Sequence, residues 1–189
     1  MFMKRWNELG EKVASCIAHL SGEEIHHDAA ITAFQRELAK VRNACGIVYV
    51  VGNGGSAGIA SHFSIDCSNT LRVPSQTLYD SNVMTCIAND YGYEQVFSRQ
   101  LERLLHKEDC LVAISSSGAS KNICQAAEIA QRKEVSVITL TGFAEDNPLR
   151  SMGWMNFWID SKDYGIIETS HFFLLHAIVD LSKSFFQTS

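Results

Sequence analysis

The stretch Ile47-Val48-Tyr49-Val50-Val51-Gly52-Asn53-Gly54-Gly55-Ser56-Ala57 joins an apolar run to a glycine-rich turn and a small polar residue. The run of β-branched and aromatic residues predicts a strand with both faces buried, as in a parallel sheet. Glycines turn the backbone sharply and leave no side chain between it and a ligand. Ser56 is a good helix N-cap. Because a helix N-terminus offers free N–H groups, the loop favours an anion such as phosphate over a simple tight turn.

Further predicted elements follow this stretch in alternation. Strands are predicted at residues 47–51, 75–79, 110–114, 135–140 and 155–159, and helices at residues 56–69, 82–88, 94–105, 120–132 and 166–186. This alternation predicts an α/β fold, in which a five-stranded parallel sheet has helices on both faces and forms a three-layer sandwich.

Two amphipathic helices are predicted before the first strand, at residues 4–20 and 28–44. The first rests on the helical spacing of Trp6, Leu9, Val13, Ile17 and Leu20. We therefore expect residues 1–189 to form a single domain, with a helical appendage at 1–45 and an α/β core at 46–189. The sequence leaves open whether this appendage packs on the sheet or on another subunit.

The composition is that of a soluble globular protein. The formal net charge is −5 and no basic run occurs, which argues against a nucleic-acid partner. No apolar stretch approaches the length of a membrane span, and no signal peptide is visible. The six cysteines never occur as C-x-x-C, so we expect reduced thiols packed in the core of a cytoplasmic protein.

A second polar loop, Ser115-Ser116-Ser117-Gly118-Ala119-Ser120, follows the third strand and opens a helix. Hydroxyl groups beside helix N–H groups make a phosphate cradle, although an overlong helix cap is the simpler alternative. Both loops leave the carboxyl ends of strands, where ligands bind in such sheets.

The first loop also fits the relaxed dinucleotide pattern, as Gly52-x-Gly54-x-x-Ala57. That pattern expects an acidic residue about 20 positions later, whereas Asp80 stands 28 residues beyond Gly52. Two polar loops suit a compact sugar phosphate better, with the phosphate at Ser115–Ser120 and the sugar near Asn53–Gly55.

A third group of residues has the chemistry of metal ligands. His62 and Asp66 lie four residues apart, hence on one helix face. Glu168 and His176 lie eight apart on the terminal helix, about 80° apart around it. Two imidazoles and two carboxylates suit a divalent ion such as zinc. From spacing alone, a hydrogen-bonded His–Asp pair and a core histidine at 176 remain open alternatives.

Several separated motifs, in order, resemble the sedoheptulose 7-phosphate isomerases (phosphoheptose isomerases) of the SIS, or sugar isomerase, domain group. They are Gly52-Asn53-Gly54-Gly55-Ser56-Ala57, His62-Phe63, Ile87-Ala88-Asn89-Asp90-Tyr91-Gly92-Tyr93-Glu94, Val96-Phe97-Ser98-Arg99-Gln100, Ile114-Ser115-Ser116-Ser117-Gly118-x-Ser120 and Leu140-Thr141-Gly142. The resemblance covers about residues 46–182. It implies a flavodoxin-like SIS fold and a homotetramer with active sites at subunit contacts.

The resemblance also implies roles for particular residues. We place Asn53, Gly54, Gly55, Asn89, Asp90, Ser115, Ser116, Ser117, Ser120 and Glu168 at substrate-binding positions. We expect zinc, one ion per subunit, with His62, Asp66, Glu168 and His176 as its ligands.

This chain differs from the family at positions that would carry the reaction or bind the substrate. Asp66 stands for a glutamate and Glu168 for a glutamine, and both can still bind a metal. Thr70 stands where the family has an arginine, and a second family arginine is missing from the segment Asp163–Glu168. Lys162 or Arg72 could supply the missing positive charge.

The sequence therefore predicts an aldose–ketose isomerase of a sugar phosphate. The resemblance favours sedoheptulose 7-phosphate as substrate and D-glycero-D-manno-heptose 7-phosphate as product, which would feed heptose biosynthesis. The reaction passes through an enediol and needs a base and an acid. We assign Asp66 as the base, in preference to Glu168, and His176 as the acid that acts with it. The alternative is a non-catalytic SIS module that binds a sugar phosphate or a protein.

Overall fold

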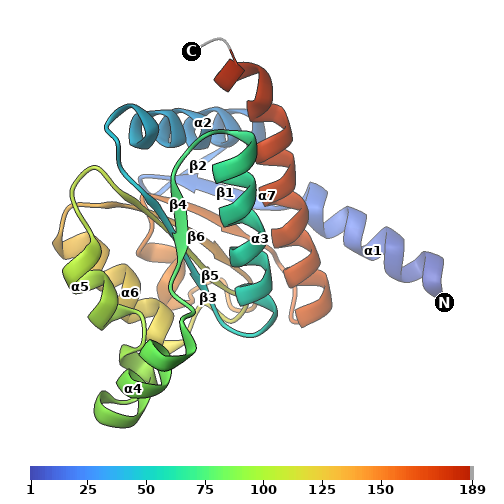
Figure 1. Ribbon diagram of the computed structural model, residues 1–189. Coiled ribbons are helices and arrows are strands. Elements are labelled where there is room, and N and C mark those ends of the chain that lie inside the picture. Colours follow the sequence, from blue (N-terminus) through green and yellow to red (C-terminus); the bar gives the residue numbers. More distant parts are fainter. Residues whose placement is uncertain (188–189) are drawn as a thin grey trace.

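The computed structural model describes residues 1–187, and its centre is a sheet of seven strands (Figure 1). Five of these strands are parallel neighbours in the order β7-β6-β5-β3-β4. Their bounds are β3 Val48–Gly52, β4 Ser75–Thr77, β5 Cys110–Ser115, β6 Ser136–Thr141 and β7 Met155–Trp158. All five match the predicted strands, and every residue of β3 is buried. The predicted parallel sheet is therefore confirmed as the larger part of the sheet.

The prediction of a helix over residues 4–20 is wrong beyond residue 14. Helix α1 spans Phe2–Ala14, and the antiparallel strands β1 Ile17–Leu20 and β2 Glu23–Ile25 follow it. Strand β1 pairs with the free edge of β7, so the sheet has seven strands rather than five. Ser21 and Gly22, which connect β1 to β2, have φ of 53° and 88°, as a two-residue hairpin turn requires.

Helices cover both faces of the sheet, which confirms the three-layer sandwich (Figure 1). One face carries α2 His27–Asn43, α3 Gly55–Thr70 and α7 Tyr164–Gln187, and the other carries α4 Ser81–Tyr91, α5 Ser98–Leu104 and α6 Lys121–Arg132. Two short 3₁₀ helices also occur, Tyr93–Gln95 between α4 and α5 and Pro148–Ser151 between β6 and β7. Alternate residues of the strands face two apolar clusters, one for each helical layer, because successive strand side chains point to opposite faces.

The two N-terminal helices have different environments. Helix α2 belongs to the sandwich, since Phe34, Leu38 and Val41 are fully buried. Helix α1 has no buried residue and projects from the body beside α7 (Figure 1). The question that the sequence left open is thus answered for α2, which packs on the sheet.

The cysteines are all free, and only part of the expectation about them is confirmed. Cys16, Cys67 and Cys110 are buried, but Cys45 and Cys86 are exposed because they lie at helix ends or on outer helix faces rather than over the sheet. Within residues 1–187, no helix is long and apolar enough to cross a membrane.

Candidate active site

The two polar loops lie side by side at the carboxyl edge of the sheet. Gly52 at the end of β3 is in register with Ile114 at the end of β5, so the segments that follow leave neighbouring strands together. The amide of Asn53 donates to Asn122 Oδ1 at 2.9 Å, and the amide of Asn122 donates back at 2.8 Å. This reciprocal pair ties the glycine loop to the first turn of α6.

A cavity of about 260 Å³ lies between the two loops and the start of α7. Eight of the predicted substrate-binding residues line it: Asn53, Gly54, Gly55, Ser115, Ser116, Ser117, Ser120 and Glu168. Ser56, Ile114 and Tyr164 complete its wall. The structure thus brings together residues from three separate parts of the chain around one small polar cavity.

Three of the four serine hydroxyls make hydrogen bonds within their own loop. Ser115 Oγ donates to Ser120 Oγ at 3.2 Å, and Ser117 Oγ accepts the N–H of Ala119 at 3.2 Å. Ser116 Oγ is buried and has no hydrogen-bond partner in the described chain. Ser120 is the N-cap of α6, yet its side chain makes no capping bond. The simpler alternative, a helix cap, therefore does not account for these hydroxyls.

The glycine loop opens α3 without a side-chain cap. Gly54 has φ of 52° and ψ of −120°, a conformation that glycine adopts readily and other residues rarely do. The carboxylate of Glu168, from the first turns of α7, lies against Gly55, where any added Cβ would collide with it. A negative group is favoured at this position because the helix N-terminus carries partial positive charge.

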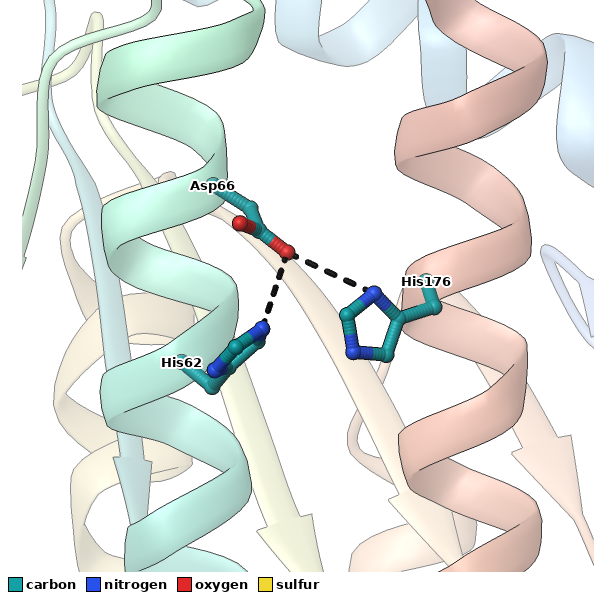
Figure 2. A group of neighbouring side chains, drawn as sticks. All are labelled: His62, Asp66 and His176. Carbon is teal, nitrogen blue, oxygen red and sulfur yellow. Dashed lines mark ion pairs between the residues drawn. The ribbon is translucent and has the colours of Figure 1, made fainter.

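The second part of the site lies further along α3 and α7, where His62, Asp66 and His176 meet (Figure 2). Asp66 Oδ2 lies 3.4 Å from His62 Nε2 and 3.5 Å from His176 Nδ1. The two imidazole rings are 4.7 Å apart between centroids, and Phe172 packs edge-on against both. One carboxylate therefore contacts two imidazoles that come from different helices.

These side chains remain accessible to solvent. The side chain of His176 is 38% exposed and that of His62 is 46% exposed. The alternative of a core histidine at position 176 is thus wrong, and His171 holds that place instead. His171 is fully buried, its Nε2 lies 3.1 Å from the carbonyl oxygen of Thr141, and burial lowers its pKa to about 4.

The donor set of the three residues fits a divalent ion. Their ligand atoms all lie within 4.8 Å of one another, and two imidazole nitrogens with one carboxylate oxygen are ligands that catalytic zinc sites use. Glu168 lies apart from this group, because eight residues of helix separate it from His176 by about 12 Å along the axis. Its carboxylate instead lines the cavity between the loops.

Two predicted substrate-binding residues do not reach this cavity. Asn89 and Asp90 lie on α4, which has no buried residue and projects from the other helical layer (Figure 1). Asn89 donates to Asp90 Oδ1 at 2.9 Å. The segment after α4 does touch the site, since Tyr93 Oη donates to Asn53 Oδ1 at 3.1 Å.

Sequence reasoning missed Asn122 and Tyr164. Asn122 follows Ser120 by two residues, so the opening turn of α6 was the available signal. Tyr164 begins α7, and no local pattern marks it as a lining residue. Lys162 and Arg72, the suggested replacements for the missing arginines, do not line the cavity.

Comparison with known proteins gives consistent matches. A model of the SIS domain family matches residues 12–142. A phosphoheptose isomerase from Campylobacter concisus (strain 13826) is 39% identical over 137 residues, 69% of this chain and 72% of the relative. One from Helicobacter pylori (strain P12) is 35% identical over 147 residues, 75% of this chain and 76% of the relative.

Two solved structures share the fold over most of the chain. The phosphoheptose isomerase GmhA from Neisseria gonorrhoeae has a TM-score of 0.76 at 30% identity, over 82% of this chain and 86% of its own. A phosphoheptose isomerase from Francisella tularensis has a TM-score of 0.81 at 27% identity, over 97% and 95%.

Proposed function

Because the chain belongs to the phosphoheptose isomerase family of SIS-domain proteins, which are sugar-phosphate isomerases, we propose that it converts sedoheptulose 7-phosphate to D-glycero-D-manno-heptose 7-phosphate. The product would enter heptose biosynthesis. We further propose that the protein works in the cytoplasm as a single-domain subunit of a homotetramer, with no nucleic-acid or membrane partner.

The observation that carries this proposal is the relation between the cavity and the histidine pair. Helices α3 and α7 meet at Gly55 with Glu168 and meet again at His62 with His176, so they run side by side from the cavity. Seven residues separate Gly55 from His62, about 10 Å along the axis of α3. A phosphate held at Ser115–Ser120 would therefore leave the far carbons of an extended sugar near the imidazoles.

The proposed reaction moves one proton between adjacent carbons through an enediol. Asp66 would accept the proton from one carbon while His176 protonates the carbonyl oxygen, which gives the enediol. Asp66 would then return its proton to the former carbonyl carbon while His176 takes the hydroxyl proton of the first carbon, which becomes the new carbonyl. The serine hydroxyls and the N–H groups at the start of α6 would bind the phosphate. Asn53, Gly54 and Gly55 would contact the sugar hydroxyls, while Asn89 and Asp90 remain proposed substrate contacts outside the cavity.

A metal ion fits this scheme. His62, Asp66 and His176 would hold a zinc ion, and Glu168, the fourth ligand expected from the sequence, would not reach it while its carboxylate lies against Gly55. When bound there, zinc supplies Lewis acidity that polarises the carbonyl and hydroxyl oxygens of the sugar.

The test is turnover of sedoheptulose 7-phosphate by the full chain, with and without added zinc. Asp66→Asn and His176→Ala should each lower kcat about 100-fold or more, since each removes a proton-transfer group. Both should keep the melting temperature, because both side chains are partly exposed. His106→Ala is the matched control, because His106 also faces an aspartate, Asp109 at 3.8 Å, but belongs neither to the cavity nor to the His62–Asp66–His176 group.

Two results would count against the proposal. Wild-type turnover in both variants would remove Asp66 and His176 from the mechanism. Absence of isomerisation with any heptulose or hexulose phosphate, with or without zinc, would favour a non-catalytic SIS module.

A further inference from the structure

The glycine loop leaves β3 at a point where β4 no longer runs beside it. Strand β4 pairs with β3 as far as Thr77, which lies opposite Val50. Gly52, two residues further along β3, is buried and has β5 on its other side. Strand β4 therefore offers no partner to the backbone N–H and C=O of Gly52, and a buried backbone group without a partner costs free energy.

The hydroxyl of Tyr79, in the segment between β4 and α4, supplies both missing bonds. Tyr79 Oη accepts the N–H of Gly52 at 2.8 Å and donates to the carbonyl oxygen of Gly52 at 3.1 Å. The Tyr79 ring lies edge-on against Phe97, with 5.8 Å between the ring centroids. Burial raises the pKa of Tyr79 above its ordinary value, so the hydroxyl keeps its proton and makes both bonds throughout the neutral pH range.

Gly52 in turn fixes the entry into α3. A Cβ at Gly52 would collide with the carbonyl group of Ser56, so the end of β3 and the first turn of α3 are in direct contact. The residues between them, Asn53–Gly55, are those proposed to contact the sugar hydroxyls. A displacement of Gly52 would therefore move the part of the loop that lines the cavity.

We propose that Tyr79 is a positioning residue for the sugar end of the substrate, an inference that rests on the proposed function. Tyr79 does not line the cavity and acts through the backbone of Gly52. The serine loop follows β5, which lies on the opposite side of β3 from β4, so its contacts to the phosphate do not depend on Tyr79. Loss of the Tyr79 hydroxyl should weaken binding of the sugar and spare binding of the phosphate.

Tyr79→Phe tests this separation, because it removes the hydroxyl and keeps the ring. Isothermal titration gives the Kd of sedoheptulose 7-phosphate and of inorganic phosphate, with EDTA present so that metal ligation plays no part. In Tyr79→Phe the sugar phosphate should bind about tenfold more weakly, since two hydrogen bonds that hold the loop are lost. The Kd of inorganic phosphate should stay at the wild-type value.

Tyr49→Phe is the matched control. Tyr49 lies on β3 itself and is 3% exposed, but within residues 1–187 its hydroxyl makes no hydrogen bond. This variant should keep both Kd values of the wild type. Melting temperatures confirm that both variants are folded.

Amide hydrogen exchange gives a second measurement that needs no ligand. The Gly52 amide should exchange about tenfold faster in Tyr79→Phe than in the wild type, because its acceptor is gone. The amide of Val50, which lies where β3 and β4 are still paired, should keep its wild-type rate. In Tyr49→Phe both amides should exchange as in the wild type.

Three results would overturn the inference: an unchanged Kd of the sugar phosphate in Tyr79→Phe, an equal loss for both ligands, or an unchanged exchange rate of the Gly52 amide. An equal loss would mean that Tyr79 supports the cavity as a whole rather than its sugar end. A wild type that binds inorganic phosphate but not sedoheptulose 7-phosphate contradicts the proposed function instead. The exchange rate of Gly52 then still decides whether Tyr79 holds the loop.

Discussion

His171 couples the stability of the fold to pH. Its imidazole is fully buried on α7, and burial lowers its pKa to about 4, whereas the unfolded chain has a histidine pKa of about 6.5. The unfolded state therefore binds the proton more readily. The contribution of neutral, buried His171 to the free energy of unfolding is therefore fully present above about pH 6.5 and is lost as the pH falls towards 4.

We expect this group to lower the free energy of unfolding by about 2 kcal/mol between pH 7 and pH 5. Urea unfolding at both pH values measures the loss. His171→Gln keeps a donor for the Thr141 carbonyl but cannot be protonated, so the loss should be smaller by that amount. His106→Gln, at a side chain that is 76% exposed, should behave as the wild type. An equal pH dependence in all three proteins would contradict the prediction.

The two histidines of α7 show what the sequence could and could not predict about the site. Both stand in an apolar helix, and the sequence identified position 176 as a ligand or a core residue without deciding between them. Which side of α7 faces α3 depends on how α7 packs on the sheet. That packing involves residues far apart in the chain, so a local pattern does not predict it. The glycine and serine loops were predictable because each motif carries its own local chemistry.

Metal binding tests the ligand set that the structure brings together. We expect the wild type to bind one zinc ion per chain. His62→Ala should weaken zinc binding by about tenfold or more, because it removes one of three converging donors. Glu168→Gln should retain zinc binding, since the Glu168 carboxylate lies beside Gly55. Competition with a chromogenic chelator measures both. A comparable loss in Glu168→Gln would show that Glu168 swings to the metal.

At the scale of elements, the hairpin β1–β2 depends on its turn. Gly22 has φ of 88°, so Gly22→Ala should destabilise the protein by about 1 kcal/mol. Gly10 lies within the exposed helix α1, and a Cβ there meets nothing within 4 Å. Gly10→Ala should therefore stabilise α1 by about 0.5–1 kcal/mol. Thermal unfolding of the two variants should shift in opposite directions, and equal shifts would contradict the turn's role.

The same hairpin explains the largest error of the sequence-based fold. Ile17 and Leu20 continue the spacing of Leu9 and Val13, so a local pattern favours one long helix. The strand forms because the edge of β7, over 130 residues later, offers unpaired backbone groups. The five parallel strands were predictable for the opposite reason, since burial on both faces leaves an apolar run that is visible locally.

At the scale of the whole molecule, the layers follow from the alternation of elements, but the place of α1 does not. Its ion pairs to the loop before α7, Arg5 with Asp163 and Lys12 with Asp160, are exposed, and exposed pairs stabilise by about 0–1 kcal/mol. They hold a helix of which Leu9 packs, partly buried, against the core, whereas the apolar side chains of its first turns are exposed. Phe2, Met3 and Trp6 are 76%, 61% and 61% exposed.

An exposed apolar cluster of this kind is typical of an interface, and in the proposed homotetramer other subunits would cover it. Light scattering on the eluted protein should give four times the chain mass of 21.0 kDa. Trp6→Glu places a charge in the cluster and should yield smaller species, because burying an unpaired charge is costly. Lys4→Glu, a charge change at an exposed position of the same helix, should keep the wild-type mass. A tetramer that survives Trp6→Glu would place the interface elsewhere, and a monomeric wild type would contradict the assembly itself.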